Sequence, residues 1–178
     1  MLETIELPLT KNYVSSWTVP SALRELAQNV IDAKEQYNSF VTINDNTIEF
    51  KTENYTLSRN TLALGQSSKT NNTNSIGQFG EGYKLALLVL ARADIPVHII
   101  NGTEVWAARF KYSDSFETEV LAIDIEFDGF DIYATDLTIS VGPVSNEHLA
   151  EFKQQYLAFT DSSTLIDTDY GSILTNKP

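Results

Sequence analysis

Apolar residues recur at helical spacing near the start of the chain and predict its first helix. From Leu23 to Ile31 they fall at every third or fourth position, which forms one apolar stripe along a helix. Pro20 suits the first turn, because its missing N–H group would have no partner there, and Thr18 can cap the N-terminus. A second stretch, 83–93, is apolar on nearly all sides and predicts a buried helix.

Alternating apolar and polar residues predict strands in most of the remaining chain. Two short segments, 40–43 and 47–51, are joined by the turn residues Asn44-Asp45-Asn46. Further strands are predicted at 97–101, 104–112, 117–127 and 130–141. The Asp128-Gly129 pair between the last two is typical of a hairpin turn. Short helices are predicted at 58–64 and at 146–159, the second capped by Ser145.

This order of elements predicts the fold class. Helices that are segregated from a run of antiparallel strands favour an α+β fold. We expect a two-layer α/β sandwich, with a mixed, mostly antiparallel sheet covered on one face by helices. Residues 1–160 are expected to form one domain, and the polar segment 161–178 a tail or linker. The alternating segment 2–9 predicts an edge strand, although a strand exchanged within a homodimer stays open.

Composition narrows the function classes. Twenty-four acidic residues against twelve basic ones give a net charge of −12, which disfavours DNA binding by this domain alone. The absence of cysteine excludes disulfides and thiolate metal sites, and two histidines leave little for a histidine-based zinc centre. No apolar run is long enough to cross a membrane. We therefore expect a cytoplasmic protein, whether bacterial, phage-encoded or otherwise intracellular, with no membrane partner.

Three polar residues share one face of the predicted first helix. Glu25, Asn29 and Asp32 stand at positions i, i+4 and i+7, which places them within roughly 60° of one another. A solvated polar stripe would explain these three residues alone. A carboxylate with a carboxamide oxygen one turn away is, however, also a set of hard oxygen ligands that suits magnesium.

A glycine-rich loop precedes the second helix. Gly77, Gly80 and Gly82 lie in the segment IGQFGEGYK, residues 76–84. Glycines allow the backbone to approach a phosphate closely, and the N-terminus of the following helix offers free N–H groups. The spacing G-x-x-G-x-G and the preceding polar segment disfavour a Rossmann dinucleotide site, and a P-loop would need Gly-Lys-Ser/Thr.

The two motifs together resemble the GHKL superfamily of ATP-binding proteins. Residues 23–33, LRELAQNVIDA, are similar to its N-box, E-x-x-x-N-x-x-D-A, with an opening like that of heat-shock chaperones. Residues 65–69 and 76–84 look most like the MORC proteins. A weaker similarity, at 134–139, is to a late Gly-Thr strand of that family. The resemblance implies a Bergerat-type fold that binds ATP and magnesium.

The resemblance also implies roles for individual residues. Glu25 would be the general base that activates water, and Asn29 would hold magnesium. Lys84 and Lys69 would give cationic help to the phosphates, and Thr135 would lie near the adenine. The full set that it implies for nucleotide binding is Asn29, Asp32, Ala33, Glu53, Lys69, Gly77, Gln78, Phe79, Gly80, Glu81, Gly82, Tyr83, Lys84 and Thr135.

One segment departs from the GHKL pattern. The family reads adenine through an aspartate in a D-x-G-x-G motif after the second strand of the hairpin. Here residues 51–57 read KTENYTL, without glycine. Glu53 could accept the adenine amino proton, but the strand register could equally place Thr52 at that position.

Two functions follow from these patterns. The first is a GHKL-type ATPase that hydrolyses ATP slowly to drive a conformational or dimerisation change, completed by a homodimer partner or an additional C-terminal domain. The alternative is a degenerate Bergerat domain that acts as a non-catalytic interaction scaffold. The altered adenine segment favours the scaffold, whereas Glu25 favours the ATPase, since a scaffold needs no carboxylate at the water position.

Overall fold

The computed structural model describes residues 2–62, 81–127 and 134–155, together with the backbone of 162–168 and 171–176. Its first helix, α1 (Val19–Ala33), begins where the sequence predicts. Thr18 is the N-cap, and its hydroxyl accepts a hydrogen bond from the backbone N–H of Ser21 at 3.4 Å. The Thr18 backbone N–H in turn donates to the Ser21 hydroxyl, which completes a capping box. Leu23, Leu26 and Val30 are buried on the predicted apolar face.

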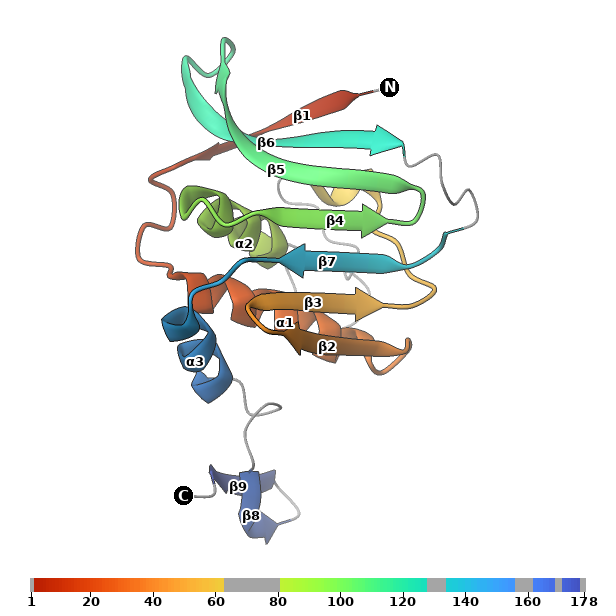
Figure 1. Cartoon of the computed structure of the whole chain (residues 1–178), viewed down its shortest axis with the longest axis vertical. Helices are drawn as coiled ribbons and strands as arrows, with labels where there is room; N and C mark the ends of the chain where they lie inside the picture. Colours follow the sequence, from red (N-terminus) through yellow and green to blue (C-terminus); the bar gives the residue numbers. More distant parts are fainter. Residues whose placement is uncertain (1, 63–80, 128–133, 156–161, 169–170, 177–178) are drawn as a thin grey trace.

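Seven strands form one sheet in the order β1-β6-β5-β4-β7-β3-β2 (Figure 1). The strands are β1 (Glu3–Thr10), β2 (Ser39–Asn44), β3 (Thr47–Thr52), β4 (Val97–Asn101), β5 (Glu104–Ser113), β6 (Thr118–Phe127) and β7 (Leu137–Val141). Every neighbouring pair is antiparallel. The sheet is therefore antiparallel throughout its described strands, rather than mixed as predicted.

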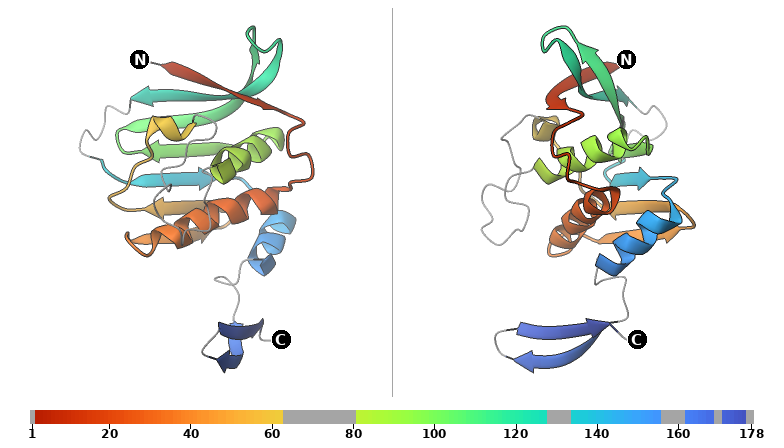
Figure 2. Two further views of the ribbon diagram at one scale, coloured as in Figure 1. Left: turned by 180° about the vertical axis from the view of Figure 1, so that it is seen from behind. Right: turned by 90° about the vertical axis from the view of Figure 1, so that its left-hand side faces the viewer.

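Helices cover one face of this sheet, as expected for a two-layer sandwich. Figure 2 shows α1 and α2 (Glu81–Arg92) side by side on that face, with α3 (Asn146–Gln155) next to α1. The core between the layers contains Trp106, Phe50 and Leu88, all at most 1% exposed. Along β3, burial alternates, so Ile48 and Phe50 face the helices. None of the described helices lies on the sheet's other face, which we call the helix-free face.

The Asp128-Gly129 hairpin prediction is wrong. Residues 128–133 lie outside the described residues, but the strands on either side do not pair. β6 pairs with β5 and β1, whereas β7 lies between β4 and β3, with Ile139 opposite both Ile99 and Phe50. The turn predicted at Asn44–Asn46 is confirmed by the β2–β3 hairpin, and β4 and β5 also pair as a hairpin. Gly102, in the second of these turns, has a positive φ of 59°.

The remaining elements differ in detail from the prediction. The short helix expected at 58–64 is a 3-10 helix, η1 (Arg59–Leu62), as far as the described residues extend. The last helix begins as predicted, with the Ser145 hydroxyl accepting from the backbone N–H of His148 at 3.2 Å. The tail, expected to be irregular, contains the two-stranded hairpin β8 (Ser162–Thr168) and β9 (Gly171–Asn176). No helix among the described residues is long and apolar enough to cross a bilayer.

The N-terminal strand is an edge strand of the chain's own sheet. Glu3, Thr4 and Ile5 pair in register with Ile125, Asp124 and Ile123 of β6. The Thr4 hydroxyl donates to Asp124 Oδ1 at 2.7 Å, and so joins the two strands through their side chains. The ordinary edge strand is thus the arrangement that this structure contains.

Candidate functional site

The three polar residues of the first helix lie along one flank of α1, and the first of them, Glu25, meets the start of α2. Glu25, Asn29 and Asp32 are half-buried, while Leu26 and Val30 between them are buried. Seven residues of helix rise by about 10 Å, so Glu25 and Asp32 mark the two ends of an extended strip. Such a strip can contact widely separated groups of one elongated ligand.

Asn29 is held by its amide nitrogen. The Nδ2 atom donates to the backbone carbonyl of Glu25, one turn earlier, at 2.9 Å. This bond fixes the carboxamide and leaves Oδ1 as its acceptor atom. A carboxamide oxygen in that role is a suitable ligand for magnesium.

The Glu25 carboxylate lies between α1 and the start of α2. Its side chain is 23% exposed, and Oε1 is 3.4 Å from the Nη2 atom of Arg24. On the other side, a β-carbon added to Gly82 would lie 2.5 Å from Oε2. A real β-carbon does not approach an oxygen so closely, so only glycine at this position leaves the carboxylate where it is. The structure therefore brings together Glu25 of one motif and Gly82 of the other, two residues that are 57 positions apart in the sequence.

The side chains next to Gly82 leave α2 in other directions. Lys84 is only 1% exposed, and its burial lowers the pKa of its ammonium group, against the opposing effect of the nearby Glu81 carboxylate. Lys84 follows Gly82 by two residues, or roughly 200° around the helix, so it does not point toward Glu25. Together with residues from β1 and the loop after it, it surrounds a hollow lined by Pro8, Leu9, Tyr13, Glu81, Lys84 and Leu85.

Tyr83 contributes a buried phenol. Its hydroxyl oxygen is buried and has no hydrogen-bond partner among the described residues. Burial, and to a smaller extent the nearby Tyr55, raise the pKa of this phenol far above its ordinary value, so it stays protonated. Within the described part of the chain it is thus a donor without an acceptor, near Tyr55.

The rest of the predicted glycine loop lies outside the described residues. This holds for Lys69, Gly77, Gln78, Phe79 and Gly80, so the structure does not place them.

The C-terminal end of α1 lies at the end of the sandwich where β3 ends and β7 begins (Figure 1). Ala33, the last residue of α1, is half-buried, and β3 ends at Thr52 near the same end of the sandwich (Figure 1). Thr52 is 4% exposed and continues the helix-facing alternation of Ile48 and Phe50. The Ser39 hydroxyl of β2 lies 3.2 Å from the Thr52 hydroxyl and forms a buried hydrogen bond with it.

Glu53 points the other way. Its Oε2 accepts a hydrogen bond from Asn38 Nδ2 at 2.8 Å, and its backbone N–H donates to the Asn38 carbonyl at 3.0 Å. Glu53 follows Thr52 directly, opposite the residue that precedes Ser39, so the alternation places it on the helix-free face. Of the two registers left open by the sequence, the structure thus places Thr52 on the helix-facing side.

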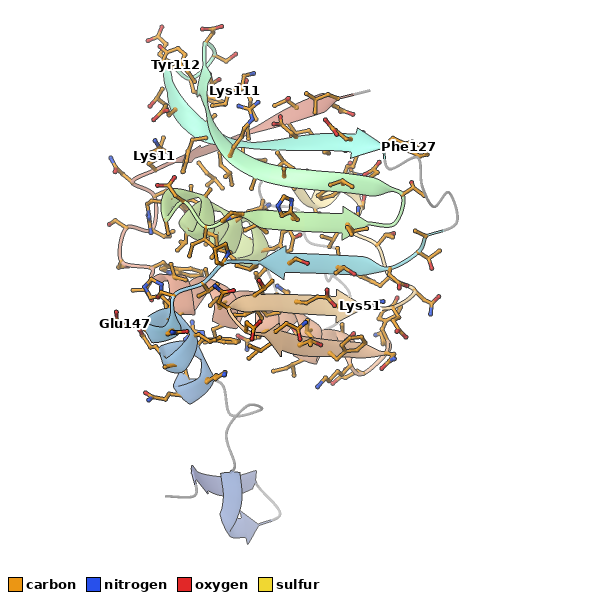
Figure 3. All side chains as sticks on the ribbon, in the orientation of Figure 1. Lys11, Lys51, Lys111, Tyr112, Phe127 and Glu147 are labelled. Atoms are coloured by element: carbon orange, nitrogen blue, oxygen red, sulfur yellow. The ribbon has the colours of Figure 1, made fainter. Side chains whose placement is uncertain are left out.

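Thr135 is exposed just before β7, and its hydroxyl lies 3.5 Å from Asn54 Oδ1. The adjacent Asp136 accepts from the Asn54 backbone N–H at 3.0 Å and forms an ion pair of 3.2 Å with Lys51, which is labelled in Figure 3. The backbone N–H of Asn54 and the Lys51 ammonium lower the pKa of the Asp136 carboxyl. Asp136, like Glu53, is therefore already bonded to other residues.

Sequence reasoning missed two residues of this region. Ser39 carries no motif, and only its pairing with Thr52 across the hairpin reveals it. Asp136 was read as part of a Gly-Thr-like strand rather than as the ion-pair partner of Lys51. The alternation of Ile48, Phe50 and Thr52 was visible in the sequence and could have fixed the register of Glu53.

The site also bears on metal binding. Among the described residues, no group of three or more His, Cys, Asp or Glu side chains could hold a metal ion. A magnesium ion would therefore take most of its oxygen ligands from phosphates and water, as is usual for this ion, with Asn29 Oδ1 as a protein ligand.

A scan against protein-family models matched none, and a search of curated proteins found no similar sequence.

Proposed function

We propose that this chain is a GHKL-type, Bergerat-fold domain that binds ATP and magnesium along the α1 strip and hydrolyses ATP slowly. The observation that supports this most is the contact between the Glu25 carboxylate and Gly82. It joins a carboxylate to the first turn of a helix that follows a glycine-rich segment, and such a helix start can receive a phosphate.

Each residue of the strip has a task in this proposal. Glu25 accepts a proton from the attacking water, a role that requires an ionised, partly accessible carboxylate close to the terminal phosphate. Asn29, held through Nδ2, presents Oδ1 to the metal. Magnesium supplies charge neutralisation of the phosphates when bound. Asp32 and Ala33 lie further along, toward the sugar and the base. Nucleotide-dependent closure then drives a conformational or dimerisation change.

Calorimetric titration with a non-hydrolysable ATP analogue and magnesium tests the binding. We expect Asn29→Ala to weaken binding about tenfold or more, and Glu25→Ala to leave it largely intact. Gln28→Ala, on the same helix and also half-buried, is the matched control and should bind like the wild type. Phosphate release should fall roughly 100-fold or more in Glu25→Ala, the usual contribution of a general base. Equal binding by all three variants would contradict the assigned roles.

The alternative is a non-catalytic interaction scaffold, and one observation favours it. Both acids at the ends of β3 and β7, Glu53 and Asp136, are engaged with other residues, so neither is available as the adenine acceptor expected from the resemblance. If the wild type binds no analogue at millimolar concentration, the ATP proposal fails and the scaffold replaces it.

A further inference from the structure

The end of the sandwich where a base would lie is built from hydroxyl groups rather than carboxylates. α1 and β3 run in the same direction, so Ala33 and Thr52 lie at one end (Figure 1). β7 begins there too, with Leu137 opposite Thr52. The only polar side chains that β2 and β3 bury in the core are Ser39 and Thr52, as far as the described residues show.

These two hydroxyls form a reversible pair. Ser39 donates to Thr52 Oγ1 at 3.2 Å, yet each hydroxyl can both donate and accept. While Ser39 donates, the Thr52 proton is available to a ligand acceptor. If the pair reverses, Thr52 donates to Ser39, and the Thr52 oxygen can then accept from a ligand donor. A carboxylate, in contrast, only accepts when ionised. The pair can therefore serve either a donor or an acceptor on a ligand, at the cost of rotating two protons.

The neighbouring carboxylates, Glu53 and Asp136, do not replace this hydroxyl pair as a hydrogen-bond acceptor for a base. Glu53 is bonded to Asn38 on the helix-free face, and turning it inward would break that 2.8 Å bond and its strand register. Asp136 is held by Lys51 and by the backbone N–H of Asn54.

The aromatic groups nearby are also tolerant of different bases. Tyr55, three residues after β3, packs against the core with its ring centroid 5.1 Å from that of Tyr37, and its phenol influences that of Tyr83. Stacking on aromatic rings is available to every base, because each has a π face. The Tyr83 hydroxyl is buried and has no partner within residues 2–62, 81–127 and 134–155, and an acceptor on a ligand would satisfy it.

We infer that this site binds purine nucleoside triphosphates with little discrimination between adenine and guanine, because Thr52 and Ser39 replace an acceptor-only carboxylate. Adenine presents an amino donor at the position where guanine presents a carbonyl acceptor. A carboxylate favours the first and repels the second, whereas the hydroxyl pair matches both. This inference rests on the proposed nucleotide binding and specifies its substrate class.

Competition between non-hydrolysable ATP and GTP analogues, each with magnesium, tests the inference on the full chain. We expect wild-type dissociation constants within about tenfold of each other. Thr52→Asp should weaken the guanine analogue relative to the adenine analogue by about tenfold or more, as expected when a polar group is mismatched in a buried site. Glu53→Gln, changed on the helix-free face, is the matched control and should leave the ratio of the two constants unchanged.

A second variant covers the case in which a buried aspartate prevents folding, which thermal denaturation would reveal. Thr52→Val keeps the shape and removes the hydroxyl, so both analogues should weaken by a similar factor. A wild-type preference of 100-fold or more for the adenine analogue would overturn the inference while leaving nucleotide binding intact. A ratio that shifts in Glu53→Gln, or a Thr52→Val protein that binds both analogues as tightly as the wild type, would also overturn it. If neither analogue binds, the proposed function itself fails, and the inference falls with it.

Discussion

Gly82 and Glu25 approach each other so closely that a single added methyl group would displace the carboxylate. The added carbon would lie 2.5 Å from Oε2 and 3.5 Å from Cδ. The atom in the way is the end of a flexible side chain, so Glu25 can rotate aside without disturbing the backbone. Position 82 therefore controls where the carboxylate lies more than whether the chain folds.

Gly82→Ala should preserve folding and reduce hydrolysis. Alanine is favoured over glycine within a helix by about 1 kcal/mol, so the free energy of unfolding should stay equal or rise. Phosphate release should fall about tenfold or more, because the carboxylate is moved away. In the double variant with Glu25→Gln, the second change should cost little more, since both act through one group. A fully active Gly82→Ala protein would show that the position of Glu25 is unimportant.

Gly142→Ala, unlike Gly82→Ala, should destabilise the fold. A β-carbon there would lie 2.9 Å from the Asn46 carbonyl oxygen and 3.0 Å from the Thr47 α-carbon, and φ is 154°. Since these neighbours are backbone atoms of the β2–β3 turn, they cannot move aside without distorting the sheet. We expect a loss of about 2–4 kcal/mol in the free energy of unfolding, measured with urea. Stability equal to that of Gly82→Ala would contradict the distinction between flexible and rigid neighbours.

Arg92, the last residue of α2, should be difficult to replace even with lysine. Its guanidinium donates to the carbonyls of Lys11 and Tyr13 at 3.0 and 3.2 Å, and to that of Trp17 at 2.9 Å. These bonds hold the loop between β1 and α1, in which Val14 has a positive φ of 45°. An ammonium group lacks the planar fork that reaches several carbonyls at once.

We therefore expect Arg92→Lys to lower the free energy of unfolding by about 1–3 kcal/mol in urea titrations. The same change at the exposed Arg24, whose guanidinium lies 3.4 Å from the Glu25 carboxylate, is the control for charge and length. Equal effects at the two positions would rule out a specific role for the carbonyl contacts.

Asp124 should make stability depend on pH in the acid range. Hydrogen bonds from Arg109, and secondarily from Thr4, lower the pKa of its carboxyl. The ionised Asp124 carboxylate therefore contributes fully to stability above the unfolded-state pKa of about 3.9. This contribution is lost as the pH falls through the lower pKa of the folded state.

Asp124→Asn should thus reduce the free energy of unfolding by about 1 kcal/mol at pH 7, and by less as the pH falls below about 3. Urea titrations at several pH values measure both effects. Asp114→Asn, on the exposed β5–β6 turn, makes the same change in charge and is the control. A difference that grows on acidification would reverse the sign expected for a lowered pKa.

The sequence predicted the helices and most strands, because their signals are local. The cap at Thr18 and the apolar period from Leu23 act within one helix, and the Asn44–Asn46 turn acts within one hairpin. The placement of β7 was missed for the opposite reason. An Asp-Gly turn reports a reversal of the chain, but the insertion of Leu137–Val141 between β4 and β3 depends on packing between distant segments.

The same division applies to the site. Helical spacing was enough to place Glu25, Asn29 and Asp32 on one flank of α1. The approach of Gly82 to Glu25 depends on how α1 packs against α2, which spacing along the sequence does not determine. The outward position of Glu53 could have been predicted, since it follows from strand alternation once Thr52 is recognised as the last helix-facing residue of β3.

The pairing of the first strand with β6 has a consequence for how the chain is made. Thr4 and Asp124 are bonded to each other although 120 residues separate them. A ribosome that adds about 5–20 residues per second releases β1 on the order of ten seconds before its partner exists. Until then, the alternating N-terminal segment has an unpaired backbone. Slow, non-local pairing of this kind lengthens folding and leaves the nascent chain dependent on protection from aggregation.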